Sequence, residues 1–286
     1  MKSVKLEKYH CMGNDYLVFD PNKNELELTK ENIKLICNRN FGIGSDGIMA
    51  GPYLDEEKMY VKILNPDGSE VEQSGNGMSI FAKYLKDAGY VQKSNVSWMT
   101  LGGEVSVYYL NEEGTRVKIS MGKPTFWSDE IPVTGERREM VNQTMVFGKI
   151  PYITTCVSIG NPHCVIWMNE ISKELVCRIG EHSENADCFP DKVNTQILNV
   201  LDRTNIQIEI YERGAGYTLA SGSCACAAAS AAYKLGLADN KMYVHMPGGT
   251  LEVEIKEDGV IYMVGEVGYV GRITLGNEMA EKLRAL

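Results

Sequence analysis

The chain has 286 residues, of which 44% are hydrophobic and 23% are charged, and its formal net charge is −9. This composition is that of a globular protein and excludes long disorder, collagen and coiled coil. The negative charge gives no general attraction to nucleic acid or to anionic membranes. No apolar run follows the first lysines and no stretch would span a bilayer, so we expect a cytoplasmic protein without a signal peptide.

Eight cysteines and four histidines are scattered along the chain. A cytoplasmic chain of this length needs no disulfides, so the cysteines are expected to be reduced thiols. The pair Cys224 and Cys226 is spaced as CxC with no histidine nearby, which does not predict a metal site.

The local patterns are mostly those of strands, with a few helices between them, which predicts an α+β fold. In chain order we expect a helix over 29–38, a helix over 78–88, a strand over 104–108, a link over 124–139, a helix over 224–235 and a strand over 251–255.

Several landmarks recur at one fixed spacing. Ser74 and Ser221 each precede glycine and differ by 147 positions (221 − 74), and Asn14 and Asn161 each follow glycine at the same spacing (161 − 14). A domain-sized period indicates a duplicated domain rather than a solenoid. We therefore predict two structurally equivalent halves. The halves are 1–122 with a C-terminal return of 271–286, and 123–270, and the active site is expected in the cleft between them.

The two Ser-Gly turns each stand directly before a predicted helix. The N–H groups at a helix start are unpaired and the dipole is positive there, so these turns could hold a carboxylate. The alternative is that Ser74 and Ser221 are ordinary N-caps, a role that serine favours.

Motifs along nearly the whole chain resemble those of the diaminopimelate epimerases. They are Lys8 to Tyr16 (KYHCMGNDY), Phe41 to Gly47 (FGIGSDG), Asn65 to Glu70 (NPDGSE), Gly75 to Gly77 (GNG), Gly160 to His163 (GNPH) and Glu212 to Thr218 (ERGAGYT).

The resemblance implies a fold of two pseudo-symmetric halves, each a mixed β-sheet wrapped around a central helix. It also implies an isomerase of lysine biosynthesis that inverts an α-carbon without pyridoxal phosphate, metal or redox cofactor. One thiolate would remove the α-proton while an opposite thiol delivers one to the other face. This sequence has serine at both thiol positions, Ser74 and Ser221, and a serine hydroxyl is a poor base without an activating partner. We therefore expect the chain to be inactive, either because both cysteines were changed by engineering or because it is a natural relative that lost or altered the activity.

The resemblance also implies roles for other residues. His163 and Glu212 would flank the catalytic positions and tune their protonation. The remaining residues would bind the substrate: the reacting end is held by Asn14, Gly75, Asn76, Gly77, Gly222 and Ser223, and the far end by Asn65, Asn161, Asn194 and Arg213.

Four departures from the family pattern leave the substrate open: Cys11, Met78-Ser79, Glu266-Val267 and Cys224. The leading prediction is an epimerase of LL- and meso-diaminopimelate. The alternatives are a racemase of another amino acid such as histidine, a natural non-catalytic amino-acid binder and, least favoured, a serine-dependent dehydratase. The expected partner is a small amino acid, not nucleic acid or membrane, and a homodimer is allowed for.

Overall fold

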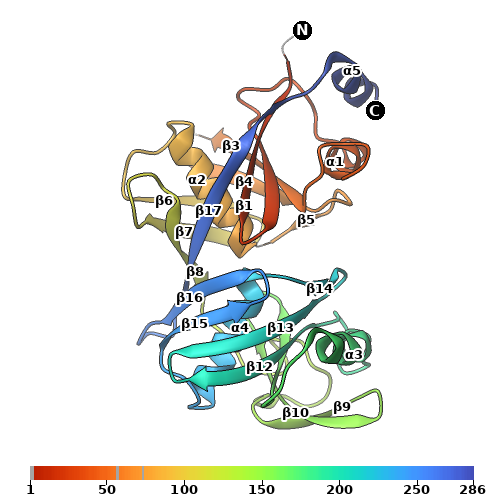
Figure 1. Cartoon of the computed structure of the whole chain (residues 1–286), viewed down its shortest axis with the longest axis vertical. Helices are drawn as coiled ribbons and strands as arrows, with labels where there is room; N and C mark the ends of the chain where they lie inside the picture. Colours follow the sequence, from red (N-terminus) through yellow and green to blue (C-terminus); the bar gives the residue numbers. More distant parts are fainter. Residues whose placement is uncertain (1–2, 56–57, 73) are drawn as a thin grey trace. The chain divides into compact units, whose positions relative to one another are not determined.

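The computed structural model describes residues 3–55, 58–72 and 74–286 (Figure 1). The chain divides into two compact units, Met1–Ile119 with Gly265–Leu286, and Ser120–Val264. The unit boundaries therefore differ from the predicted 122/123 and 270/271. The cause is strand β17 (Ile261–Thr274), which begins in the second unit and ends in the first. Its residues 261–264 pair with strand β16, and its residues 267–274 pair with strand β1.

The first unit is a mixed sheet with three helices. Strand pairs β1–β2, β3–β4, β4–β5 and β6–β7 are antiparallel, whereas β2–β3 and β4–β6 are parallel. Its elements are β1 (Lys5–Cys11), β2 (Asn14–Phe19), α1 (Lys30–Cys37), β3 (Gly47–Asp55), β4 (Lys58–Leu64), β5 (Glu70–Val71), α2 (Gly75–Asp87), β6 (Asn95–Thr100), β7 (Gly103–Tyr109), β8 (Arg116–Gly122, which runs into the second unit) and α5 (Asn277–Ala285).

The second unit repeats this order of pairings. Pairs β10–β11, β12–β13, β13–β14 and β15–β16 are antiparallel, whereas β11–β12 and β13–β15 are parallel. Its elements are β9 (Gln143–Phe147), β10 (Ile150–Ser158), β11 (Pro162–Trp167), α3 (Lys173–Ser183), β12 (Asn194–Asp202), β13 (Asn205–Glu212), β14 (Gly216–Thr218), α4 (Gly222–Lys234), β15 (Lys241–Met246) and β16 (Gly249–Ile255).

Helices α2 and α4 are the buried helices of the two units, and each lies among the strands of its own unit (Figure 1). In α4 the run from Cys224 to Ala232 is buried, and it consists of alanine, cysteine and serine. Side chains this small allow the surrounding strands to pack close to the helix axis. A helix that is apolar on all sides is typically buried in the core. Both helices begin within three residues of their predicted starts, at Gly75 and Gly222.

The segment 124–139 is not the free link that its prolines and charges predicted. Ile131, inside this segment, and Met140, the first residue after it, are fully buried in the core of the second unit. Trp127 forms a β-bridge with Glu139. Helices α3 and α5 were not predicted. In the part of the chain that the structure describes, no helix is both long and apolar enough to cross a membrane.

Candidate functional site

Ser74 is the N-cap of helix α2. Its backbone is extended, and its Oγ accepts a hydrogen bond from the backbone N–H of Gly77 at 3.1 Å. The hydroxyl of Tyr16, on strand β2, lies 3.1 Å from the same Oγ. The serine thus caps the helix, as the simpler alternative predicted, and also has a phenol as a second partner.

Ser221 is the N-cap of helix α4 and has a different partner. Its Oγ donates to Glu212 Oε2 at 2.9 Å, and the hydroxyl of Thr218 donates to Glu212 Oε1 at 2.6 Å. A carboxylate only accepts hydrogen bonds, so the direction of both is fixed if Glu212 is ionised. Ser221 thus has a carboxylate partner, although a hydroxyl that donates to a carboxylate keeps its proton.

Asn14 and Asn76 are joined in a network of fixed direction. Asn76 Nδ2 donates to Asn14 Oδ1 at 3.2 Å, and Asn14 Nδ2 donates to Asp46 Oδ2 at 2.8 Å. Arg39 donates to the other oxygen of Asp46 at 2.6 Å. Because Asp46 only accepts, it orients the Asn14 amide, which in turn orients the Asn76 amide. Asn76 Oδ1 is left buried without a hydrogen-bond partner among the described residues.

The predicted residues of the second unit gather at the ends of β11, β12 and β13. His163 Nε2 lies 2.8 Å from Asn161 Oδ1 and must donate to it, which makes Nδ1 the unprotonated nitrogen. Asn194 donates to the carbonyl of Pro162 at 2.9 Å and accepts from the backbone N–H of Arg213 at 3.0 Å. Asn194 therefore links the start of β11 to the residue that follows β13, which is a structural role in addition to any contact with a ligand.

Arg213 and Asn65 occupy turns. The Arg213 guanidinium is exposed and donates to the carbonyl of Asp191 at 2.9 Å. Asn65 follows strand β4 and donates to Ser69 Oγ at 3.0 Å. Asn65 is thus oriented within its own turn and Arg213 by the loop at Asp191, while the far-end cage that the sequence predicted stays a prediction.

Burial lowers the pKa of His163 to about 3. In the unfolded chain the pKa of histidine is about 6.5, so between these values only the unfolded state binds the proton. Stability from the neutral imidazole is complete above about pH 6.5 and is lost as the pH falls toward 3. We expect His163→Gln to make the free energy of unfolding less dependent on pH between pH 6 and 4, by up to about 1.4 kcal/mol per pH unit.

Chemical denaturation of both proteins at several pH values measures this slope. The half-buried His245, changed to Gln, is the matched control for the loss of an imidazole. Parallel stability profiles for the protein and His163→Gln would contradict the buried neutral state of His163.

Cys224 is not in a state to act as a thiolate. It lies one turn into helix α4, is fully buried, and its Sγ accepts a hydrogen bond from Gln196 Nε2 at 3.1 Å. Burial raises the pKa of its thiol well above the usual value, with the nearby Glu212 acting in the same direction. A protonated buried thiol is neither a base nor a nucleophile at neutral pH.

Three of the departures from the family pattern lie together beside helix α2. A Cβ placed on Gly265 would lie 2.3 Å from Ser79 Oγ and 3.6 Å from Cys11 Sγ. Cys11 is also the β1 partner of Val267 on β17. These substitutions therefore form one packing cluster in which glycine at 265 is required by the serine at 79, and none of them contacts the two N-cap serines in the described hydrogen bonds.

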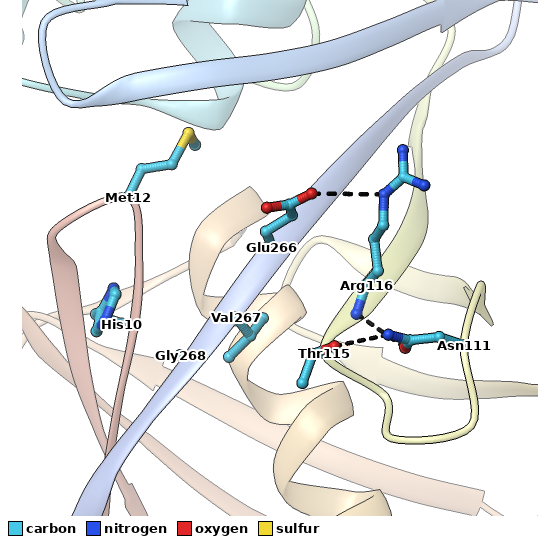
Figure 2. Close-up of a pocket in the computed structure, with 8 residues that line it drawn as sticks. All are labelled: His10, Met12, Asn111, Thr115, Arg116, Glu266, Val267 and Gly268. Carbon is cyan, nitrogen blue, oxygen red and sulfur yellow. Dashed lines mark hydrogen bonds and ion pairs between the residues drawn. The ribbon is translucent and has the colours of Figure 1, made fainter.

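A separate pocket of about 510 Å³ lies in the first unit (Figure 2). His10 and Met12 line it on one side, and the turn from Asn111 to Arg116 lines it on the other. Its polar groups pair with one another: Arg116 with Glu266 at 3.6 Å, and Asn111 Nδ2 with Thr115 Oγ1 at 2.7 Å. It contains none of the predicted site residues, and it could not be predicted because it forms between β17 and a turn distant in the chain.

The described residues contain no group of three or more His, Cys, Asp or Glu side chains placed to hold a metal ion. The groups that meet at the two N-caps are hydroxyl, carboxylate, phenol and helix N–H groups.

Solved structures with the same fold include epimerases. A predicted epimerase from Pseudomonas aeruginosa matches with a TM-score of 0.69 at 16% identity, over 96% of this chain and 99% of that one. A hydroxyproline epimerase from Agrobacterium vitis, solved with trans-4-hydroxy-L-proline, matches with a TM-score of 0.68 at 12% identity, over 96% and 91%. The chain thus shares its mixed α/β fold with these two proteins.

Sequence relatives give the particular family. The family model described as diaminopimelate epimerase matches residues 6–127 and 155–270. "Diaminopimelate epimerase 2" of Nostoc sp. strain PCC 7120 is 46% identical over 96% of this chain and 97% of that protein. The diaminopimelate epimerase of Desulfitobacterium hafniense is 35% identical over 93% and 96%. The chain belongs to the diaminopimelate epimerase family, as the sequence motifs predicted.

Proposed function

We propose that this chain carries the active site of a cofactor-independent epimerase of LL- and meso-diaminopimelate, with serine at both proton-transfer positions. The observation that carries the proposal is the pair of serine N-caps, Ser74 and Ser221, each placed after a short strand and before the buried helix of its unit. Without thiols, the chain is expected to bind the amino acid and to exchange its α-proton very slowly or not at all.

We further propose that the two units are pseudo-symmetric halves and that the substrate lies in a cleft between them. The shared order of strand pairings supports this arrangement, as does the spacing of 147 residues between the serines (221 − 74). A cytoplasmic location, which was expected from the sequence, is kept as part of the proposal, and a homodimer is allowed for.

The helix starts would hold the reacting α-carboxylate. The N–H of Gly77 and that of Cys224 donate to the N-cap serines at 3.1 and 3.5 Å. The first N–H groups, those of Gly75 with Asn76 and of Gly222 with Ser223, lie before the helical hydrogen bonds begin and are available to a ligand. Together with the helix dipoles they would stabilise negative charge that develops on the carboxylate as the α-proton leaves.

The polar side chains would then divide between the two ends of the substrate. Glu212 and His163 would control protonation at the two catalytic positions, and Asn14 would help to hold the reacting end. The far end of diaminopimelate is a second amino acid, for which an arginine and amide oxygens are suitable partners. These are Arg213 for its carboxylate, and Asn65, Asn161 and Asn194 for its ammonium.

Two explanations of the serines differ in an observation that needs no enzyme assay. Serine codons at 74 and 221 in the source genome would indicate a natural relative that lost or altered the activity, and cysteine codons would indicate engineering.

A second candidate function is a serine-dependent dehydratase, which the Ser221–Glu212 hydrogen bond at 2.9 Å supports. It requires a substrate with a β-leaving group, which diaminopimelate lacks.

Binding and exchange by the unaltered chain test the proposal. Calorimetry is expected to show saturable binding of diaminopimelate, with weaker binding of histidine, while proton NMR in D₂O shows no loss of the Cα proton. Tighter binding of histidine would favour the racemase alternative. Absence of binding for both amino acids, or rapid exchange by the serine form, would contradict the proposed function.

A further inference from the structure

We propose that Tyr16 is a positioning residue for position 74: its phenol donates a hydrogen bond to the group at that position and favours the negatively charged form. Position 221 has the opposite partner, a carboxylate, which favours the protonated form. The two proton-transfer positions would therefore rest in different states, a base at 74 and an acid at 221. The inference rests on the proposed function in one respect, which is the use of positions 74 and 221 in proton transfer.

The ring of Tyr16 is held in one place by its neighbours. Tyr16 is 6% exposed and is paired with Gly47 across the parallel strands β2 and β3. A Cβ on Gly47 would lie 2.6 Å from Tyr16 Cε1 and 2.7 Å from the carbonyl oxygen of Leu64. Glycine at 47 thus leaves the space that the ring occupies, and the ring directs its hydroxyl to Ser74 Oγ at 3.1 Å.

The direction of the hydrogen bonds at position 74 depends on the charge of the group there. Ser74 Oγ already accepts from the N–H of Gly77, and its own hydrogen leaves the bond with Tyr16 free to run either way. A thiolate has no hydrogen, so both Gly77 and Tyr16 would have to donate to it. Two donors and a helix N-terminus stabilise the anion, which lowers the pKa of a thiol at this position.

The other N-cap also has donors, because the N–H of Cys224 donates to Ser221 Oγ at 3.5 Å and the Ser223 hydroxyl lies 3.3 Å from it. It differs from position 74 in that it also faces a carboxylate. Ser221 Oγ donates to Glu212 at 2.9 Å, and a thiol in its place would face the same carboxylate. An adjacent negative charge raises the pKa of a thiol. The fold therefore makes the two positions unequal although each is an N-cap at the start of a buried helix.

The test uses a thiol introduced at one position at a time. Ser74→Cys is prepared with and without Tyr16→Phe, and the rate of alkylation by iodoacetamide at position 74 is followed from pH 6 to 10 by peptide mass spectrometry. Tyr16→Phe removes one oxygen and keeps the ring. We expect it to slow alkylation at pH 7 by about tenfold and to move the pH profile to higher pH, since fewer thiols are ionised.

Two controls separate this effect from a general change in structure. The half-buried Cys177 on helix α3 is measured in the same digest and is expected to keep its rate. Ser221→Cys with and without Tyr16→Phe is expected to give the same profile. An unchanged profile at position 74, or equal shifts at both introduced thiols, would overturn the inference.

An activity measurement distinguishes this inference from the proposed function. If Tyr16→Phe shifts the profile at position 74 but the chain with both thiols epimerises no amino acid, the asymmetry stands and the proposed function fails. If that chain is active and the profile does not shift, the proposed function stands and the role of Tyr16 fails.

Discussion

Ser74→Cys with Ser221→Cys in one chain is expected to produce diaminopimelate epimerase activity, while either substitution alone gives little. Inversion at Cα needs a base on one face and an acid on the other, and each correctly placed proton-transfer group contributes about 10²- to 10⁴-fold. A thiol with a reference pKa near 8.5 can take both roles near neutral pH, whereas a serine hydroxyl cannot. The measurement is kcat/KM for LL- and meso-diaminopimelate in all four chains.

Stability must be followed in the same four chains. Both serines cap helices, and sulfur is a weaker hydrogen-bond acceptor than oxygen. Losing a good N-cap costs about 0.5–2 kcal/mol, so the double variant is expected to unfold more readily while gaining activity. Comparable turnover from a single introduced thiol would contradict the two-base scheme.

Arg213→Ala, made in the chain with both thiols, is expected to weaken catalysis on diaminopimelate strongly. A hydrogen bond to a charged group contributes about 1.5–3 kcal/mol, which corresponds to a loss in kcat/KM of about tenfold or more. Without substrate, the Arg213 guanidinium is exposed and donates to the carbonyl of Asp191. We therefore expect the loss in kcat/KM to come from the contact with the far carboxylate of the substrate.

The matched control is Arg203→Ala, which removes an exposed arginine paired with Asp239 at 2.6 Å in the same unit. It is expected to leave kcat/KM unchanged. Histidine, which has no far carboxylate, is assayed beside diaminopimelate. Equal losses for both substrates would make Arg213 structural, and turnover of histidine alone before the mutation would show that the substrate assignment is wrong.

The starts of α2 and α4 could be predicted because the signal is local in the sequence. In each case a serine that can cap a helix is followed by an apolar or alanine-rich run. Helix α3 was missed because Gly180 lies near its end, and glycine lowers helix propensity. A Cβ on Gly180 would lie 2.2 Å from the ring of Tyr211, so packing explains this glycine. The N-cap Ser172 and the buried Val176, Ile179 and Ser183 were signals that could have revealed the helix.

Of the partners of the two serines, Glu212 could be predicted from the motif resemblance and Tyr16 could not. Tyr16 lies 58 positions before Ser74 and reaches it only because strand β2 runs beside the start of α2. Glu212 precedes Ser221 by 9 positions, and the motif resemblance had already placed it near the site. The orientation of the Asn14 amide likewise depends on Asp46, whose place is set by the β2–β3 pairing.

The fate of the α-proton tests the central claim most directly. LL-diaminopimelate is incubated in D₂O with the chain carrying both Ser74→Cys and Ser221→Cys, and substrate and product are separated early in the reaction. The two-base scheme predicts one deuterium at the inverted Cα of the meso product and almost none in recovered substrate, because each face has its own acid–base group. Deuterium appearing equally in both, or product formed without deuterium, would contradict proton transfer between positions 74 and 221.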